Sequence, residues 1–191
     1  MAAEVGAEAQ AALALDDRDP WAHLAQGNLL NRLRRPHEAV RALRRALELN
    51  PNFALAHALL ASALVHRGVH EEAFDSAHHA LRLSPGDRSV GMFASMALMN
   101  VHFAAGRYAE CVACAHTMIE RSPEHIAGHI YLTAALAMQG EPTAAAAEAR
   151  GTLFRLRPEF SLAWMTENLP PTGELAERIR DALRKAGVPE E

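Results

Sequence analysis

One phrase recurs three times along the chain, as AALALDD (11–17), RALELNP (45–51) and HALRLSP (79–85). Within these copies Ala12, Ala46 and Ala80 stand 34 residues apart. A constant period of this length is typical of stacked helix–turn–helix units, each of which buries its apolar face against the next. The sequence therefore predicts an all-α fold, a right-handed α-solenoid of antiparallel helix pairs.

The composition agrees with this fold and excludes several other classes. Half of the residues are apolar but only 5% are aromatic, and no stretch shows the alternating β-branched pattern of a strand. A net charge of −4 and a pI near 6.3 give no reason to expect nucleic acid or an anionic membrane as partner. Apolar runs end well before the roughly 18 residues of a membrane span, so none is expected.

The termini and cysteines indicate the compartment. MAAEVGAEAQ (1–10) lacks the basic start and apolar core of a secretory signal. Two cysteines close together cannot form a disulfide framework. We therefore expect a cytoplasmic protein.

The pattern within each period resembles the tetratricopeptide repeat, a pair of antiparallel helices. That family has small residues at positions 8, 20 and 27, larger apolar groups at 7, 11 and 24, and proline at 32. Counting back from Pro51 gives a first unit at 20–53, with Gly27 at position 8 and Ala46 at position 27. The second unit, 54–91, fits equally well and includes an insertion.

The remaining units are less regular. The third, 92–125, has Met118 at position 27, and four extra residues, RSVG (88–91), are expected in the turn before it. The fourth, 126–160, places Ala145 at position 20 and carries one extra residue before Pro158.

Both ends of the chain differ from a full repeat. Residues 1–19 match only the second helix of a unit, so the chain is expected either to be a fragment or to have its first face covered by another chain. Self-association through this exposed N-terminal helix is a hypothesis. Residues 161–191 are expected to hold a C-terminal capping helix from Thr172 to about Ala186.

Candidate catalytic or metal chemistry is weak. Cys111, Cys114 and His116 form CxxCxH, but Cys111 falls at position 20, where a small buried residue is expected. Three histidines at position 4, His23, His57 and His129, are expected to pack and donate one hydrogen bond each. We expect no catalytic residue, no cofactor and no metal.

An arginine run is read as a solvated face or, alternatively, as a docking site for an acidic segment: Arg32, Arg34, Arg35, Arg41, Arg44 and Arg45.

The resemblance also implies a binding surface. In tetratricopeptide repeats, positions 2, 5, 9, 12 and 13 of each first helix line a concave groove that binds peptides. The alternative is that Trp21, Phe93 and Phe103 pack within the chain, against its first or last helix. Carried over to this chain, the expected groove residues are Trp21, Leu24, Asn28, Asn31, Arg32, Leu55, Ser62, His66, Phe93, Met96, Asn100, Phe103 and Ile130.

The favoured function is a non-catalytic scaffold that binds a peptide or helix segment of a protein partner. A second hypothesis comes from the tail. ERIRDALRKAGVPEE (177–191) resembles the closing segment of bacterial class III adenylate/guanylate cyclases that carry such repeats after the catalytic domain. This resemblance implies a regulatory or docking module of a cyclase, and repeat-bearing transcriptional regulators are the other parent considered.

Overall fold

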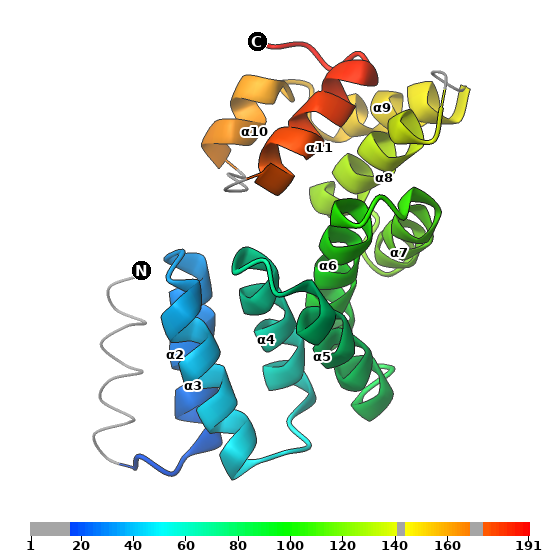
Figure 1. The fold of residues 1–191 in the computed structure, drawn as a ribbon. Helices are drawn as coiled ribbons and strands as arrows, with labels where there is room; N and C mark the ends of the chain where they lie inside the picture. The colour runs from blue at the N-terminus through cyan, green and yellow to red at the C-terminus, as the bar shows by residue number, and fades with distance from the viewer. Residues whose placement is uncertain (1–15, 141–143, 169–173) are drawn as a thin grey trace. The chain divides into compact units, whose positions relative to one another are not determined.

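The computed structural model describes residues 16–140, 144–168 and 174–191. Within these ranges the chain forms ten α-helices and no β-strand, which confirms the all-α fold. None of these helices combines the length and the apolar character that crossing a bilayer requires. The helices, drawn in Figure 1, are α2 (Pro20–Arg32), α3 (Pro36–Leu49), α4 (Ala54–His66), α5 (His70–Leu83), α6 (Arg88–Ala104), α7 (Tyr108–Arg121), α8 (Ile126–Met138), α9 (Ala144–Leu156), α10 (Leu162–Asn168) and α11 (Glu174–Lys185).

Short turns join successive helices into antiparallel pairs. The carboxylate of Asp19 caps α2 by accepting a hydrogen bond from the Trp21 backbone N at 2.9 Å. Pro36 begins α3, where its missing N–H costs no helical hydrogen bond. Gly68 follows α4 with φ +73°, but the equivalent residue after α2 is Arg34, with φ +58°. This left-handed conformation costs a residue with a Cβ atom about 1 kcal/mol or more.

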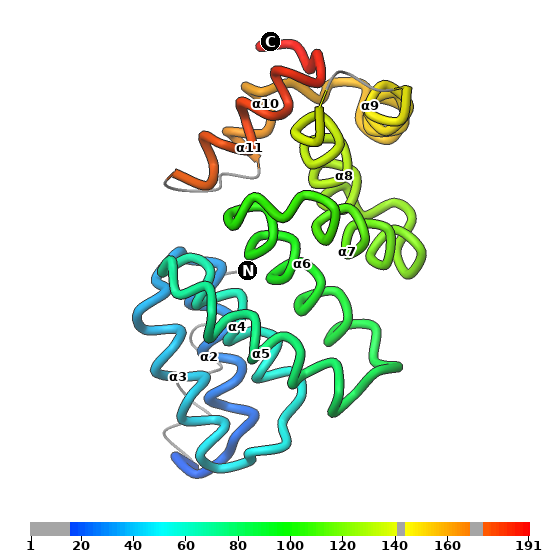
Figure 2. Tube along the Cα trace, turned by 45° about the vertical axis from the view of Figure 1, so that its right-hand side comes forward, coloured from blue at the N-terminus to red at the C-terminus, as the bar shows by residue number. Residues whose placement is uncertain are grey.

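The chain divides into two compact units, unit 1 (Met1–Ala97) and unit 2 (Leu98–Glu191), and the division falls inside α6. In unit 1, α2 packs on α3, α4 packs on α5, and both α2 and α3 contact α4. In unit 2, α8 packs on α7 and α9, and α11 lies against α8 and α10. Figures 1 and 2 show these neighbouring helices from two directions.

Small residues line the helix contacts of unit 1 in the predicted register. Each alanine at positions 8, 20, 24 and 27 has no exposed surface, so these side chains lie at the closest helix approaches. The alanines at these four positions, each at 0% exposure, are Ala39, Ala46, Ala61, Ala73, Ala77 and Ala80.

The two repeats of unit 1 fill the contact between positions 8 and 24 with different side chains. The α2–α3 pair has Gly27 at position 8 and Leu43 at position 24. A Cβ atom on Gly27 would lie 2.5 Å from Leu43 Cγ, which is too close without movement. The α4–α5 pair has Ala61 and Ala77 at the same positions. A larger partner on one helix therefore accompanies a smaller partner on the other, as close packing requires.

The position-4 histidines make one recurring contact. In each case the imidazole Nε2 lies within hydrogen-bond distance of the backbone carbonyl six residues earlier, so the ring donates an N–H there. This bond fixes the turn that enters each first helix, and it confirms the expected role of these histidines. The pairs are His23 with Asp17 (2.8 Å), His57 with Pro51 (2.9 Å) and His129 with Pro123 (2.7 Å).

Unit 2 replaces the alanine at position 27 by Met118, which is 2% exposed. Gly128 of α8 lies beside Met118 and makes room for the neighbouring Ile119, because a Cβ atom there would lie 2.9 Å from Ile119 Cγ1 but at an ordinary contact distance of 3.5 Å from Met118 Cγ. Cys111 fills position 20 with no exposed surface, as a small apolar residue would.

The predicted insertion at residues 88–91 is wrong in its placement. These residues form the first turn of α6, which is therefore 17 residues long, and they do not lie in the preceding turn. The side chain of Asp87 accepts a hydrogen bond from the Val90 backbone N at 2.8 Å, which starts the helix early. Four residues make about one helical turn, so the extension leaves the later side chains on the same face.

The fourth repeat also differs in register. Ala145, predicted for the buried position 20, is exposed, whereas its neighbour Ala146 is 2% exposed. Ala149 and Leu153 follow Ala146 at spacings of three and four, so all three residues lie on one buried face of α9. The extra residue of this repeat, which the sequence placed before Pro158, therefore precedes α9.

The end of the chain contains a helix that the sequence did not predict, the seven-residue α10. The backbone N–H groups of Leu162 and Ala163 donate to the carbonyls of Pro189 and Glu190, both at 2.9 Å. Arg150 donates to the Ala186 carbonyl at 2.6 Å. The expected capping helix is present as α11. Its predicted cap Thr172, and the N-terminal helix predicted within 1–15 for self-association, lie outside the described residues.

Candidate interaction surfaces

The residues at positions 2, 5, 9, 12 and 13 of the first helices form what we call the first-helix face. In unit 1 this face runs over α2, α4 and the first part of α6. At its N-terminal end Trp21 is 61% exposed, although it is a large apolar residue. Its ring meets that of Phe53 edge to face, with centroids 4.6 Å apart. Leu55 is half-buried at the equivalent position of α4.

The middle of the face in unit 1 is polar and partly buried. Asn28 and Ser62, at position 9 of α2 and α4, are half-buried. Asn31 contributes to packing, because its Nδ2 donates to the Leu59 carbonyl on α4 at 3.0 Å. Leu24 is only 7% exposed. Of the predicted residues here, Asn28 and Ser62 thus offer more surface to a partner than Leu24 does.

Positive charge gathers at the C-terminal end of the face. Arg32 and His66, both exposed, occupy position 13 of α2 and α4, and the exposed Arg34 follows α2. Although His66 is exposed, partial loss of water lowers its pKa, and the positive charge of Arg34 lowers this pKa further. Unit 1 therefore presents aromatic and apolar groups at one end of the face and the cations Arg32 and Arg34 at the other.

The part of α6 that belongs to unit 1 adds two predicted residues. Phe93 and Met96 are both half-buried, so neither is fully enclosed by the protein. They extend the apolar character of the first-helix face beyond α4.

The corresponding face of unit 2 is covered by the chain itself. Phe103 has no exposed surface and Ile130 is 4% exposed. Asn100 accepts a hydrogen bond from the Tyr131 hydroxyl at 2.6 Å, and burial raises the pKa of that hydroxyl. Ala134, at position 9 of α8, is fully buried, whereas position 9 in α2 and α4 is half-buried. The alternative interpretation of Phe103, packing within the chain near the last helix, is the one observed.

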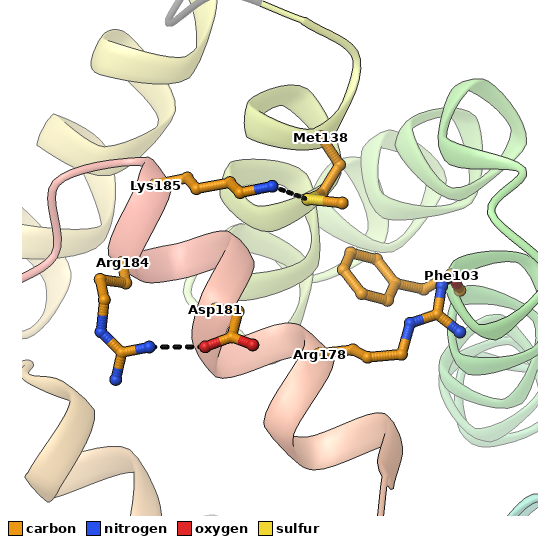
Figure 3. A pocket seen from close by; sticks show the side chains of 6 residues that line it. All are labelled: Phe103, Met138, Arg178, Asp181, Arg184 and Lys185. Atoms are coloured by element: carbon orange, nitrogen blue, oxygen red, sulfur yellow. Dashed lines mark hydrogen bonds and ion pairs between the residues drawn. The ribbon is translucent and has the colours of Figure 1, made fainter.

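The covering element is α11, whose buried residues Ile179 and Leu183 lie on one face. Arg178 donates to the carbonyls of Ala104 at 2.7 Å and Phe103 at 3.3 Å, at the C-terminal end of α6. These donors satisfy carbonyls that a helix end leaves without partners. Figure 3 shows this side of α11, where Arg178 lies beside Phe103.

The cysteines do not form a reactive site. Burial raises the pKa of Cys111 to about 12, and the thiol donates to the Met99 carbonyl with a sulfur–oxygen distance of 3.5 Å. Burial also raises the pKa of Cys114. Both thiols are therefore protonated and weakly nucleophilic at neutral pH. In the described part of the chain, no group of three histidine, cysteine or acidic residues is placed to hold a metal ion.

The arginine run forms ion pairs on a solvated face. Three of its six arginines pair with glutamates on α3 and α5. Such exposed pairs contribute little each, about 0–1 kcal/mol. The pairs are Arg35 with Glu38 (2.5 Å), Arg44 with Glu72 (2.6 Å) and Arg45 with Glu48 (2.8 Å).

Comparison with known proteins agrees with the helical architecture. A sequence profile of the tetratricopeptide repeat matches residues 24–88, which span the two regular repeats. The fold is similar to that of YrrB, described as a TPR protein with an unusual peptide-binding site, with a TM-score of 0.62 and 16% identity over 93% of this chain and 90% of that chain.

Two further solved structures show the same likeness. MamA matches with a TM-score of 0.64 and 16% identity over 79% of this chain and 85% of that one. Residues 41 to the end of MamA from Desulfovibrio magneticus RS-1 match with a TM-score of 0.63 and 15% identity, over 88% and 93% of the two chains. At these identities the likeness shows the fold alone.

A comparison with curated protein sequences finds no match. The resemblance of the tail to cyclase-associated repeats therefore stays a prediction from the sequence.

Proposed function

We propose, from the premise that this chain carries tetratricopeptide repeats, that it is a non-catalytic scaffold whose unit 1 binds a peptide or helical segment of a protein partner. The observation that carries the proposal is the exposure of Trp21, 61% of whose surface is open to solvent on the first-helix face. Exposed tryptophans with a rigid neighbour are frequent anchors of protein interfaces. The contact with Phe53 supplies that rigidity.

The charge at the other end of this face favours an acidic partner. Arg32 and Arg34 lie at or just after the end of α2, and neither forms an ion pair in the described part of the chain. His66 at the end of α4 adds a neutral hydrogen-bonding ring at neutral pH, because its pKa is lowered. Arg34 also keeps an unfavourable left-handed φ of +58° where the next repeat has glycine. Strained residues of this kind cluster at functional sites. The preferred segment thus carries apolar side chains toward Trp21 and acidic side chains toward Arg34.

The side chains of this face supply no reactive group. Asn28 and Ser62 in its middle are neutral hydrogen-bonding groups, suited to contacts with a peptide backbone or amide. The likeness to a protein described as having a peptide-binding site supports recognition of the same general kind. The cytoplasmic location expected from the sequence stays part of this proposal.

The test is a selection of 15-residue peptides from a random library on the full chain, followed by affinity measurements by fluorescence anisotropy. We expect selected peptides to combine apolar and acidic residues. Trp21→Ala should weaken their binding about tenfold or more, the range of an interface anchor. Arg34→Glu should weaken them further in low salt, because it reverses a charge.

Trp164→Phe provides the matched control, since Trp164 is the other tryptophan of the chain and lies in unit 2. Peptides that bind the Trp21→Ala and Trp164→Phe variants equally well would contradict the proposal. So would a selection in which lysine-rich peptides bind as tightly as acidic ones.

A further inference from the structure

Unit 2 contains a cleft of about 400 Å³ between α11 and the helices it covers. This volume lies in the range of small-molecule sites, about 300–1,000 Å³. The half-buried Met138 of α8 supplies its accessible apolar lining, Phe103 of α6 borders it without exposed surface of its own, and charged residues of α11 form its rim. The rim residues are Arg178, Asp181, Arg184 and Lys185.

Three of the four rim charges already have partners. Arg184 bonds to Asp181 at 2.5 Å and to Glu190 at 2.6 Å, and the hydrogen bond from Arg184 lowers the pKa of Glu190. Arg178 donates to the Phe103 and Ala104 carbonyls at the negative end of the α6 dipole. The negative charge of Asp181 is thus compensated and does not repel an anion strongly.

Lys185 is the exception. Its Nζ lies 3.7 Å from the sulfur of Met138, which is a weak acceptor, and no carboxylate in the described residues forms an ion pair with it. Figure 3 shows its side chain reaching from α11 to α8 across the mouth of the cleft. One uncompensated ammonium group thus stands directly above an apolar lining.

We propose that this cleft binds an apolar carboxylate, with the anionic group on Lys185 Nζ and the apolar group against Met138. A single flexible cation suits a monoanion better than a phosphate, which is usually held by several donors. Two sources share this chemistry, a peptide C-terminus that ends in an apolar residue and a free fatty acid. The site belongs to unit 2 alone and does not rest on the function proposed for unit 1.

The experiment uses the fact that Lys185 is the only lysine in the sequence. Reductive methylation with ¹³C-formaldehyde labels Lys185 and the α-amino group, and it keeps the charge of the lysine. The probes are octanoate and the peptide acetyl-Gly-Ser-Gly-Leu with a free carboxylate. Their neutral matches are 1-octanol and the same peptide as its amide. We expect the carboxylates to shift the Lys185 methyl signal in a saturable way, and the neutral probes to shift it little.

Variants give an independent readout by calorimetry on unlabelled full-length protein. Lys185→Gln should weaken carboxylate binding about fivefold or more, and Lys185→Arg should retain it, because only the first removes the charge. Arg67→Gln, an exposed cation in unit 1, is the control and should bind normally. Thermal melts establish that each variant is folded.

The outcomes are distinct for the two sources. Lys185-dependent binding of the peptide but not of octanoate identifies a peptide C-terminus, and the reverse result identifies a free fatty acid. Lys185-dependent binding of both also supports the site, and the tighter probe then names the source. Binding that is equal for the acid and its neutral match, unchanged in Lys185→Gln, or absent for both carboxylates overturns the proposal.

Discussion

Unit 1 and unit 2 are built from the same helix pair but treat their first-helix faces differently. In unit 1, position 9 is half-buried and position 13 is exposed in both α2 and α4. In α8 of unit 2, position 9 is fully buried and Met138 at position 13 is half-buried, because α11 lies over the helix. The repeat itself therefore does not determine whether this face is open, and the helix that follows the last repeat does.

The two units also differ in how they fill their helix contacts. Unit 1 uses alanine at position 27, whereas unit 2 uses Met118 opposite Gly128. Within unit 1, Gly27 with Leu43 stands where the next repeat has Ala61 with Ala77. The repeat constrains the combined volume of facing side chains more strongly than it constrains either residue.

The largest expected effect tests this volume rule in unit 1. Leu43→Ala should lower the free energy of unfolding by about 2–5 kcal/mol, because it opens a cavity at a fully buried site. Gly27→Ala alone should also destabilise, since its Cβ atom would meet Leu43. The double variant reproduces the Ala61–Ala77 pair, so it should lose less than the sum of the single losses. Urea unfolding of the four proteins measures this coupling, and additive losses would contradict the rule.

A second substitution compares position 27 in the two units. Ala80→Leu should destabilise by about 1–3 kcal/mol, because Ala80 has no exposed surface and the larger side chain would overpack the helix contact. Met118→Leu in unit 2 should cost less, because this exchange nearly conserves the volume of the side chain. Thermal melts of both variants provide the measurement. Equal stability of Ala80→Leu and wild type would show that the register is wrong.

Loss of Arg178 should loosen the cover over unit 2. Arg178→Met removes two donors to the end of α6 but keeps an unbranched side chain, so we expect a loss of about 1 kcal/mol. Hydrogen exchange should become faster in α11 and stay unchanged in α2 and α3. Equal acceleration in both units would argue against a local role for this contact.

Arg34→Gly should raise the free energy of unfolding, by less than the substitutions above lower it. Glycine adopts the observed φ of +58° without strain, so the variant should be more stable by up to about 1 kcal/mol, less the entropy that glycine gains on unfolding. Gly68→Arg, at the equivalent position of the next repeat, should destabilise instead. Chemical denaturation compares the two variants directly. If Arg34→Gly is also less tightly bound by acidic peptides, stability and binding compete at this residue.

The smallest expected effect is the pH dependence of stability. Burial lowers the pKa values of His57 and His66 in unit 1 and of His125 in unit 2. Because each folded-state pKa lies below the unfolded value of about 6.5, the unfolded chain binds more protons as the pH falls. Stability should therefore decrease as the pH drops through 6.5 and level off below the folded-state pKa values. His57→Gln should reduce this dependence, which denaturation at pH 7.5 and 5.5 would detect.

The regular part of this architecture could be predicted because alanine, glycine and proline recur at a fixed interval. Their steric roles are local, so Gly27, Ala46 and Ala80 are placed correctly from spacing alone. Residues 88–91 could not be placed in the same way. An insertion of four residues gives the same downstream pattern whether it lengthens a turn or adds one turn of helix.

The exposure of the candidate surface residues could likewise be predicted only where it depends on nearby sequence. The exposure of Trp21 follows from its position in its own repeat. Phe103 instead packs against the rings of Tyr108 and Tyr131, and its backbone carbonyl accepts a hydrogen bond from Arg178 of α11, more than 70 residues later. The apolar stripe of α11 predicts that this helix packs against another part of the chain, but the periodicity does not identify the helices that it contacts. The contact between Lys185 and the sulfur of Met138 could not be predicted, because no sequence pattern connects these two residues.

The bond from Arg178 to the end of α6 has a consequence for how the chain folds. Most helix contacts join neighbours along the chain and close short loops, whereas this bond spans 74 residues. Closing such a long loop costs more entropy and slows the step that requires it. We expect the helical hairpins to form first and the docking of α11 to come last, so that during synthesis unit 2 reaches its final state only after α11 has left the ribosome.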